Sequence, residues 1–500
     1  MKKLKITKGL GLAIACLVLA TSCDKQFLDR RPFGDVSSED FYTTQKNIEI
    51  AAVGLYGTLQ TFYNPNYPSI AELPADNASD GSGVATGSGQ LDKFTIIPNN
   101  AILTAAWRNS YNSILASNKI LESLSRIQFS DDEKRKQVEG EARFVRALSY
   151  FNLVRMFGKV PLDTLTLTQE QARQSVRNEV EEVYEAIISN LQEASVLLPE
   201  SYTGGNVGRA TKYTALTLLG KVYLTTHEYE RAIDPLKDVI ESERYSLLPK
   251  YADIFNPMNA NHAESIFEIQ YEGGTLGEGS RWSFTSHPNL LQEAMKISAG
   301  NSLIPTTGAG SIVNLFSSEG EATSERHLAT IGTMSYQNAS GATLSARHVK
   351  KHYMDHTMQN QSDDNWPLLR YADVLLMYAE VLNETSSIPP TEAIEFVNQI
   401  RRRAFGLPIN TVSAYDLTSS KTANTGAFGE AISLERRLEL AFEGHRWFDL
   451  IRTDKYVDVM NSYFGSNSPY KVEPYHKLYP VPQREMDINP LLKPNNEGYN

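Results

Sequence analysis

Apolar residues recur at helical spacing along most of this chain, and the strict alternation typical of half-buried strands is scarce. Helices are predicted at about 38–62, 100–126, 130–157, 177–198, 209–226, 228–242, 367–384, 391–405 and 427–452. Residues that commonly cap helices support two of these starts: Ser130-Asp131-Asp132-Glu133 opens the third range, and Thr391-Glu392 opens the eighth. We therefore expect a mainly α-helical fold with a few short strands.

The spacing of small and large residues predicts how neighbouring helices pair. One set follows the offsets of a tetratricopeptide repeat, namely Leu219, Gly220, Tyr223, Ala232 and Leu236. In such a unit the small side chains let two antiparallel helices approach closely. Residues 187–199 match the second half of another unit, and residues 368–405 form a looser one with an insertion. Three matches predict stacked helix pairs.

Two long stretches, 66–99 and 255–366, interrupt the helical pattern with glycine, serine, asparagine and isolated aromatic residues. Loops of this length in a compact domain are usually either functional or disordered. Because neither stretch is a strict low-complexity repeat, we favour an ordered, functional surface.

The N-terminus indicates export. Four lysines precede an apolar run from Gly9 to Ala20, which is too short to cross a bilayer as a helix but fits a secretory signal. Leu19-Ala20-Thr21-Ser22-Cys23 is typical of a bacterial lipobox, in which Cys23 becomes the acylated first residue. We predict a signal peptide at 1–22 and a lipid-anchored chain, the alternative being an ordinary signal with an incidental cysteine.

Cysteine content and charge exclude several classes of site. The two cysteines are Cys16, which leaves with the signal, and Cys23, which is lipidated. No thiol then remains for a disulfide, a thiolate zinc site or a cysteine nucleophile. The formal net charge is −11, and loss of the four leader lysines lowers it to −15, so we expect no nucleic-acid partner. Membrane attachment would rest on acyl chains such as palmitate, and firm anchoring needs more than one.

Two glutamates in the last helical range resemble an acid–base pair. Glu439 and Glu443 are four residues apart, so one helix would place both carboxylates on one face. The expected partners are arginines within the same few turns, Arg436, Arg437 and Arg446. Because helical ion pairs at this spacing are common, we interpret the block as structural and predict no catalytic residue here. The same interpretation covers Arg370, Asp373 and Glu380.

His348, His352 and His356 form a spaced trio. On a helix they would share a face and could bind a metal ion. The segment lacks a helical apolar stripe, so we expect it to be extended, with neighbouring members of the trio about 13 Å apart. We predict no metal site and no cofactor, and the sequence contains no phosphate-binding glycine loop, HExxH or GxSxG motif.

Several segments, taken in order, resemble the SusD/RagB family of Bacteroidetes outer-membrane nutrient-binding lipoproteins. They are Cys23-Asp24-Lys25-Gln26-Phe27-Leu28-Asp29, residues 141–162, Gly208-Arg209-Ala210-Thr211, and residues 369–380, 397–401 and 435–450. The resemblance spans the chain. It implies a tetratricopeptide-like scaffold carrying a loop-rich ligand region, with an N-terminal helical region at 23–250 and a C-terminal region at 251–500.

The family resemblance also implies a function. It predicts a protein on the outer face of the outer membrane that binds an extracellular oligosaccharide or polysaccharide and delivers it to a TonB-dependent SusC-like transporter. Peptide is the alternative ligand, because some relatives pair with peptide importers. Two other classes stay open: a surface glycoside hydrolase, and a lid without a ligand site of its own.

A glycan-binding surface needs exposed aromatic rings for sugar C–H faces and polar groups for hydroxyls. Trp107 and Trp447 belong to helical blocks and are expected in the core. The candidate contacts lie in the loop-rich stretches: Trp282, Phe284, Tyr336 and Trp366, with Asn77 and Asp80 added by the resemblance. A hydrolase would instead need two carboxylates across a cleft, for which the loops offer Asp76, Asp80, Glu278 and Asp363-Asp364.

Overall fold

The computed structural model describes residues 41–64, 66–81, 83–285, 303–337, 340–352, 358 and 360–499. The signal peptide and Cys23 lie outside these ranges, as does His356. The described part of the chain is mainly helical, which confirms the predicted fold class. Within it, no helix combines the length and the apolar character that a membrane span requires.

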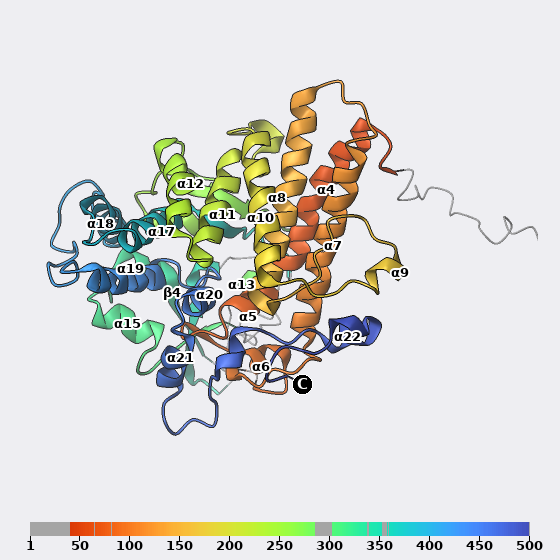
Figure 1. The fold of residues 1–500 in the computed structure, drawn as a ribbon. Helices are drawn as coiled ribbons and strands as arrows, with labels where there is room; N and C mark the ends of the chain where they lie inside the picture. The colour runs from red at the N-terminus through yellow and green to blue at the C-terminus, as the bar shows by residue number, and fades with distance from the viewer. Residues whose placement is uncertain are drawn as a thin grey trace, which may run out of the picture.

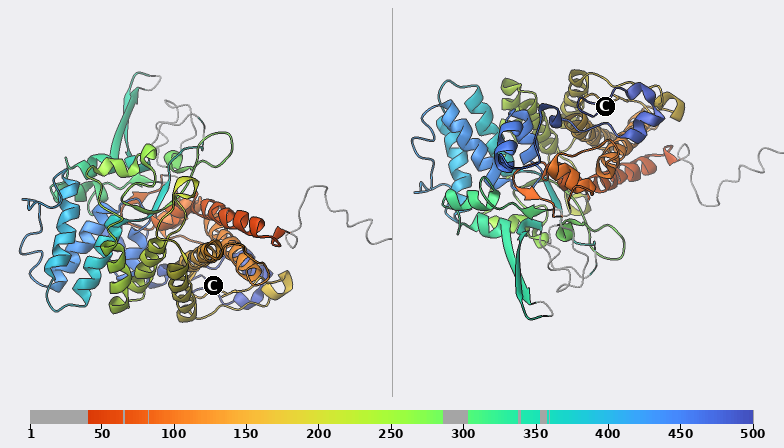
Figure 2. Two further views of the ribbon diagram at one scale, coloured as in Figure 1. Left: turned by 90° about the horizontal axis from the view of Figure 1, so that it is seen from above. Right: turned by 90° about the horizontal axis from the view of Figure 1, so that it is seen from below.

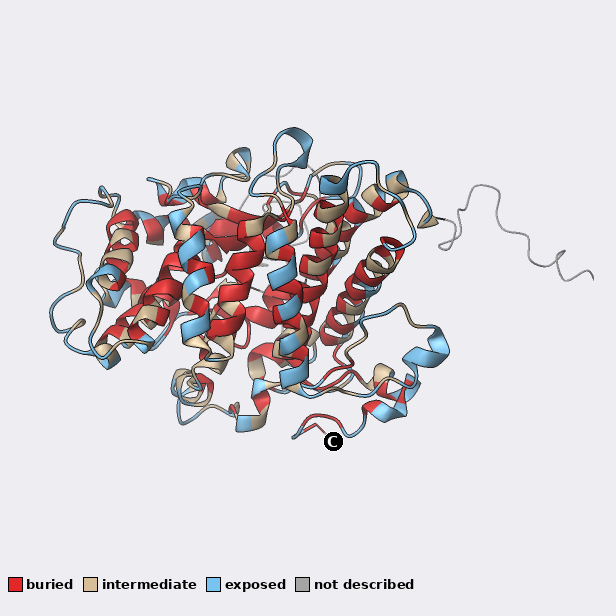
Figure 3. Cartoon of the chain, turned by 45° about the horizontal axis from the view of Figure 1, so that its top comes forward, coloured by how far each residue is buried: buried red, intermediate tan, exposed pale blue. Residues whose placement is uncertain are grey.

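Long helices stand side by side in one curved layer (Figure 1). They are α4 (Gln45–Tyr63), α7 (Ala101–Ser123), α8 (Asp132–Phe157), α10 (Val180–Leu197), α11 (Lys212–Thr225), α12 (Tyr229–Glu241), α17 (Tyr371–Glu384), α18 (Thr391–Ala404) and α19 (Thr425–Glu439). Each packs mainly on its neighbours along the row, from α4 and α7 through α11 and α12 to α17 and α18. Their buried residues face inward and their exposed residues lie on the outer side (Figure 3).

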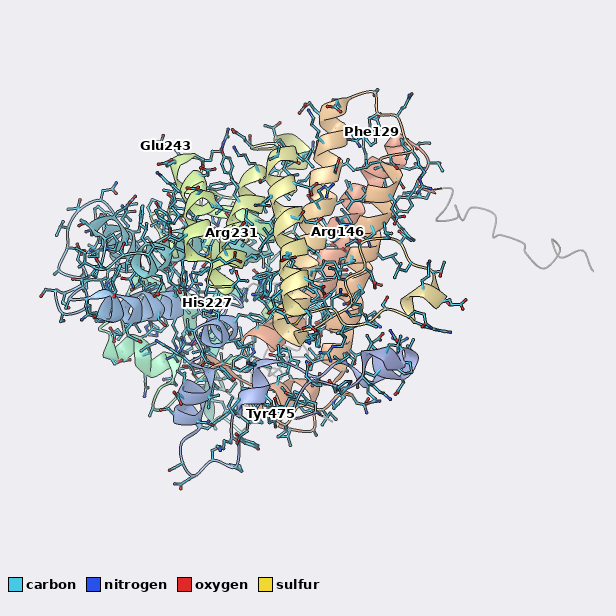
Figure 4. The ribbon with its side chains drawn as sticks, in the orientation of Figure 1. Phe129, Arg146, His227, Arg231, Glu243 and Tyr475 are labelled. Carbon is cyan, nitrogen blue, oxygen red and sulfur yellow. The ribbon has the colours of Figure 1, made fainter. Side chains whose placement is uncertain are left out.

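The predicted repeat residues form the contact between α11 and α12. All are buried, and Gly220 lies so close to Leu236 that an added Cβ would be 2.5 Å from the leucine Cδ2. Further along the row, Arg146 of α8 donates to the side-chain oxygens of Asn118 on α7 and Asn190 on α10 (Figure 4). The helices are therefore joined by close backbone approach in one place and by a buried guanidinium in another.

Shorter elements pack below and behind this layer. The helices are α5 (Asn66–Ala71), α6 (Gly87–Lys93), α9 (Gln169–Ala172), α13 (Trp282–Thr285), α15 (Ile312–Ser318), α16 (Glu325–Thr330), α20 (Arg446–Arg452), α21 (Tyr456–Phe464) and α22 (Gln483–Ile488). The strands are β1 (Ala78–Ser79), β2 (Ser265–Ile269), β3 (Ile304–Pro305), β4 (Ile331–Gln337), β5 (Thr343–Val349) and β6 (Trp366–Arg370).

These strands form three antiparallel pairs: β1 with β3, β2 with β6, and β4 with β5. The β4–β5 hairpin projects from the side of the molecule opposite the exposed helical layer (Figure 2). His348 lies in β5, so the expectation of an extended segment is confirmed for this residue. His352 lies in the short 3₁₀ helix Lys350–His352 that follows.

Three predicted helices differ from the structure. In the range 38–62, α4 begins at Gln45, where the Thr44 side chain caps it. The helix predicted at 367–384 is observed as α17, which begins four residues later, at Tyr371. The reason is that residues 366–370 pair with β2 as strand β6. The range 427–452 is broken: α19 ends at Glu439, Phe442 and Gly444 have φ of 67° and 81°, and α20 starts at Arg446. The prediction that Glu439 and Glu443 share one helix face is therefore wrong.

Candidate ligand-binding surface

The structure brings together two of the tryptophans predicted to contact a ligand. Trp282 opens α13 and Trp366 opens β6, and their ring centroids are 4.8 Å apart. Tyr67 of α5 packs edge-on against Trp366, Tyr271 packs edge-on against Trp282, and His352 stacks on Trp366 at 5.0 Å. We call these five residues the aromatic cluster. The sequence did not single out Tyr67 or Tyr271, since neither belongs to a recognisable motif.

The aromatic cluster lies inside the molecule, and the expectation that its indoles form an open surface is wrong. Trp282 and Trp366 are both 0% exposed. The physical reason is that the two indoles pack on each other and on neighbouring rings, and Trp366 also lies close to the backbone at Gly444. The residues near the two tryptophans are joined as well, since Ser280 and Ser362 exchange two backbone hydrogen bonds at 2.9 and 3.2 Å. A glycine- and serine-rich segment can thus carry a buried aromatic ring. The side chains of Phe284 and Tyr336 lie outside the described part of the chain.

Polar residues hold the loop of residues 272–281 in place through three further hydrogen bonds. Asn64 at the end of α4 donates to the Gly279 carbonyl and accepts from the Arg281 amide. The Gly273 amide donates to the Asp363 carboxylate at 2.7 Å. The outer surface then consists of exposed groups, among them Arg281, Glu278 and Asp363. These are the polar side chains that a ligand approaching the loop would meet first.

Asn77 and Asp80 support the fold of the neighbouring segment. Asn77 is fully buried, and its side-chain oxygen accepts from the Arg437 guanidinium at 3.0 Å. Asp80 is 5% exposed, and its backbone amide donates to the carboxylate of Asp92. Between them, β1 pairs with β3. The Asn77 side chain and the Asp80 backbone amide thus hold the loop that follows α5, and both side chains are buried.

Glu439 and Glu443 belong to a buried ion-pair network. Burial alone would raise the pKa of Glu439, but the cations Arg403, Arg370 and Arg326 around it lower that pKa to about 2. Arg370 also binds Glu443 through Nε at 2.6 Å, and Lys351 binds the same carboxylate at 2.7 Å. Several donors keep both carboxylates ionised. A general acid must carry a proton that it can donate, so these two groups are unsuited to that role.

The partners predicted for these glutamates were wrong. Arg436 instead pairs with Asp373 and Asp449, while Arg437 and Arg446 both contact Asp76. The break after α19 explains this, because it turns the helix end toward cations from distant parts of the chain. The structural interpretation of the charged block is nevertheless confirmed.

The complete buried network balances its charges. Its cations are Arg326, Lys351, Arg370, Arg401 and Arg403, and its anions are Glu264, Glu321, Glu435, Glu439 and Glu443. Seven members come from α16, α18, α19, β6 and the turn that carries Lys351, while Glu264, Glu321 and Glu443 lie in connecting segments just before β2, before α16 and after α19. The network therefore fastens the helical layer to the elements that carry the loop surface. We call it the interior ion network.

Most of the acids considered for a hydrolase are engaged in the interior. Asp76 is 1% exposed and pairs with Arg446 at 2.8 Å. Asp364 is buried and contacts the His352 ring nitrogen Nδ1 at 3.2 Å, while Nε2 of the same ring donates to the Phe442 carbonyl. Only Glu278 and Asp363 of that set are exposed. Among the described residues, no group of three or more histidine, cysteine or acidic side chains is arranged to hold a metal ion.

Comparison with protein families gives two matches. A family model described as the SusD family matches residues 320–499, and one described as starch-binding and associating with the outer membrane matches residues 26–224. Among curated relatives, SusD-like protein P25 of Formosa agariphila is 28% identical and aligns with 96% of this chain and 97% of its own. A SusD-like protein of Bacteroides ovatus is also 28% identical, covering 92% of this chain and 85% of its own.

Solved structures agree with these matches. A laminarin-binding SusD-like protein superposes with a TM-score of 0.74 at 25% identity, covering 92% of this chain and all of that one. A SusD homolog from Bacteroides thetaiotaomicron gives a TM-score of 0.79 at 24% identity over 93% of this chain and 99% of its own. The second likeness, at that identity, concerns the fold alone.

Proposed function

The chain belongs to the SusD/RagB family, and from that premise we propose that it captures an extracellular glycan at the cell surface and delivers it to a SusC-like TonB-dependent transporter. The family match is the observation that carries this proposal. The lipobox ending at Cys23 supplies the anchor, and the outer face of the outer membrane is the proposed location.

Glycan is favoured as the ligand class for two reasons. The N-terminal family model is described as starch-binding, and a similar structure at 25% identity is that of a laminarin-binding protein. Peptide remains the alternative, because a family fold does not fix the ligand.

Binding without cleavage is favoured over hydrolysis by the state of the carboxylates. A glycosidase needs one carboxyl kept as an acid and a second one across a cleft. Asp76 is ion-paired and buried, and Asp364 lies against His352, so neither can reach a glycosidic bond from outside. Of the exposed acids, Glu278 lies in the loop of residues 272–281 and Asp363 binds that loop at Gly273, and both can accept hydrogen bonds from sugar hydroxyls.

The ligand class is tested by electrophoresis of the full-length protein in native gels that contain candidate polysaccharides. We expect at least one glycan to retard the protein, with no new reducing ends after prolonged incubation. Release of shorter saccharides would overturn the binding-only proposal. Retardation by no glycan, together with binding of peptides, would favour the peptide alternative.

The loop surface is tested by changing its exposed side chains. Substitution of Trp282 or Trp366 by alanine would empty part of the core and report on folding rather than on binding. We expect Arg281→Ala and Asp363→Ala each to weaken glycan retention several-fold, because each removes a charged hydrogen-bonding group. Lys237→Ala, an exposed change on α12 of the helical layer, is the control. Equal retention by all three variants would show that the ligand binds elsewhere.

A further inference from the structure

A pocket of about 450 Å³ opens between α7, α9 and α22, away from the loop surface. Figure 1 places α9 and α22 together beside the lower end of α7, and Figure 2 shows them on the opposite side of the molecule from the β4–β5 hairpin. We call it the α7–α9–α22 pocket. Its volume falls within the range of small-ligand sites, roughly 300–1,000 Å³.

One wall of the pocket is aromatic and apolar. Tyr111 is half-buried there, with its hydroxyl donating to the Pro161 carbonyl at 2.8 Å, and Trp107 packs against it with ring centroids 5.3 Å apart. Asn489 holds the far side in place by donating to the Ser175 carbonyl at 2.7 Å. The walls are thus fixed by buried contacts, and an aromatic ring of this kind suits the C–H face of a sugar.

The mouth of the pocket is rich in arginine. Arg108, Arg173 and Arg484 all line it and are all exposed. Arg484 lies 3.2 Å from its neighbour Glu485, whereas Arg108 and Arg173 make no ion pair with any described residue. This contrasts with the interior ion network, where every arginine is matched by a carboxylate. Two acids, Asp163 and Glu485, also line the pocket, but they are fewer than its three arginines. In a chain with a net charge of −11, such a local excess of guanidinium groups marks a place for an anion.

We propose that the α7–α9–α22 pocket binds an acidic sugar unit, with Arg108 and Arg173 holding its carboxylate and Tyr111 lying against its ring. The inference rests on the proposed function, since it specifies an acidic saccharide as a glycan that the protein binds. Planar guanidinium groups match a carboxylate through paired hydrogen bonds. The exposed amide of Asn112 beside them can bond to a sugar hydroxyl.

An acidic peptide fits the pocket less well than a saccharide. Extended peptides bind by adding to a strand edge, and helical ones need a long apolar groove. The pocket residues come from α7, from residues 161–175 with α9, and from residues 484–492, and no described strand borders them.

The test is calorimetric titration of the full-length protein with trigalacturonate and with the same trisaccharide methyl-esterified at every carboxylate. We expect the acid to bind and the ester to bind at least about tenfold more weakly, with affinity for the acid falling as salt rises. Arg108→Gln and Arg173→Gln should each raise the Kd about tenfold. Arg126→Gln removes the same charge from another exposed arginine, just beyond α7 and outside the pocket, and should leave the Kd unchanged.

Three results would overturn the inference: equal affinity for acid and ester, unchanged affinity in both pocket variants, or equally tight binding of triglutamate. If a neutral polysaccharide still retards the protein in native gels, the inference alone has failed and the proposed function stands. If no saccharide of either kind binds, both have failed. Thermal melting of each variant checks that these surface changes leave the fold intact.

Discussion

At the scale of single residues, the carboxylates of this protein show how neighbours decide the role of a group. Glu439 and Glu72 are both buried, yet their pKa values move in opposite directions. Three arginines lower the pKa of Glu439 to about 2. For Glu72, burial outweighs the backbone donor at Gly444 and the charge of Lys351, and its pKa rises to about 8. The first is fixed as an anion, and the second exchanges a proton near neutral pH.

Removing the charge of Glu439 should be costly. The Glu439→Gln variant leaves Arg370, Arg403 and Arg326 with fewer anions than cations among side chains that are buried to 1% exposure or less. We expect a loss of about 3–5 kcal/mol in the free energy of unfolding, as for other broken buried ion pairs. The measurement is denaturation in urea, followed by circular dichroism.

Glu430→Gln is the matched control for this change. Glu430 lies on the same helix, but its side chain is 72% exposed and pairs with Lys455 at the surface. Its loss should cost less than about 1 kcal/mol. If the two variants were equally stable, the interior ion network would not be what holds α19 against β6.

Glu72 should make stability depend on pH. Its carboxyl ordinarily titrates near 4.5, and in the folded protein its pKa is about 8. Between these values the folded state keeps a proton that the unfolded state has released, so stability falls as pH rises from about 4.5 through 8.

Glu72→Gln replaces the protonated carboxyl by a neutral amide and should remove this fall. The carbonyl oxygen can still accept from the Gly444 amide, which donates to Glu72 Oε1 at 2.6 Å in the wild type. Relative to the wild type, the variant should gain about 1–2 kcal/mol between pH 6 and pH 8. Urea denaturation of both proteins at the two pH values measures the difference, and a constant difference would contradict the assignment.

At the scale of elements, local spacing was sufficient for most helices and for the α11–α12 repeat. It failed where distant residues decide the conformation. Nothing near Glu439 predicts that α19 ends there, because the break serves carboxylates whose partners come from β6, α16 and α18. Likewise, residues 366–370 resemble the start of a helix, and only pairing with β2 makes them a strand.

The expectation that Trp282 and Trp366 are exposed failed for a related reason. Loop composition predicts that a segment lies at the surface, but it does not predict which side chains of the segment point inward. Trp282 is buried against Trp366, and the nearby Ser280 bonds to Ser362, which is 82 residues away in sequence. Arg281, which directly precedes Trp282, is exposed, but because it is not aromatic it was not among the predicted ligand contacts.

The close approach of α11 and α12 can be tested with one methyl group. In Gly220→Ala, the new Cβ would lie 2.5 Å from Cδ2 of Leu236, which is fully buried. We expect a loss of about 1–3 kcal/mol in stability, because the leucine must leave its place in the contact. Thermal melting or urea denaturation measures it.

Gly54→Ala, in the middle of α4, is the control. No atom lies within 4 Å of the added Cβ there. The change should stabilise the protein by about 0.5–1 kcal/mol, since alanine favours a helix over glycine. If Gly220→Ala were also stabilising, the two helices would not be in the contact that the repeat predicts.

At the scale of the whole molecule, the interior ion network joins the helical layer to the loop-bearing side. In our proposal these buried ion pairs let the chain act as a lid that moves as one unit over its transporter, with the segment after Cys23 as the tether. The division of the chain near residue 250 into two regions stays a prediction. The two family models match either side of it, at 26–224 and 320–499.

The most direct test of the central claim is to purify the lipidated full-length protein from outer membranes in mild detergent, with its glycan added. We expect a stable complex with a TonB-dependent β-barrel transporter that retains the glycan uncleaved. Recovery of the protein without a transporter, at a glycan concentration that saturates its binding, would contradict the proposed delivery of glycan to a transporter.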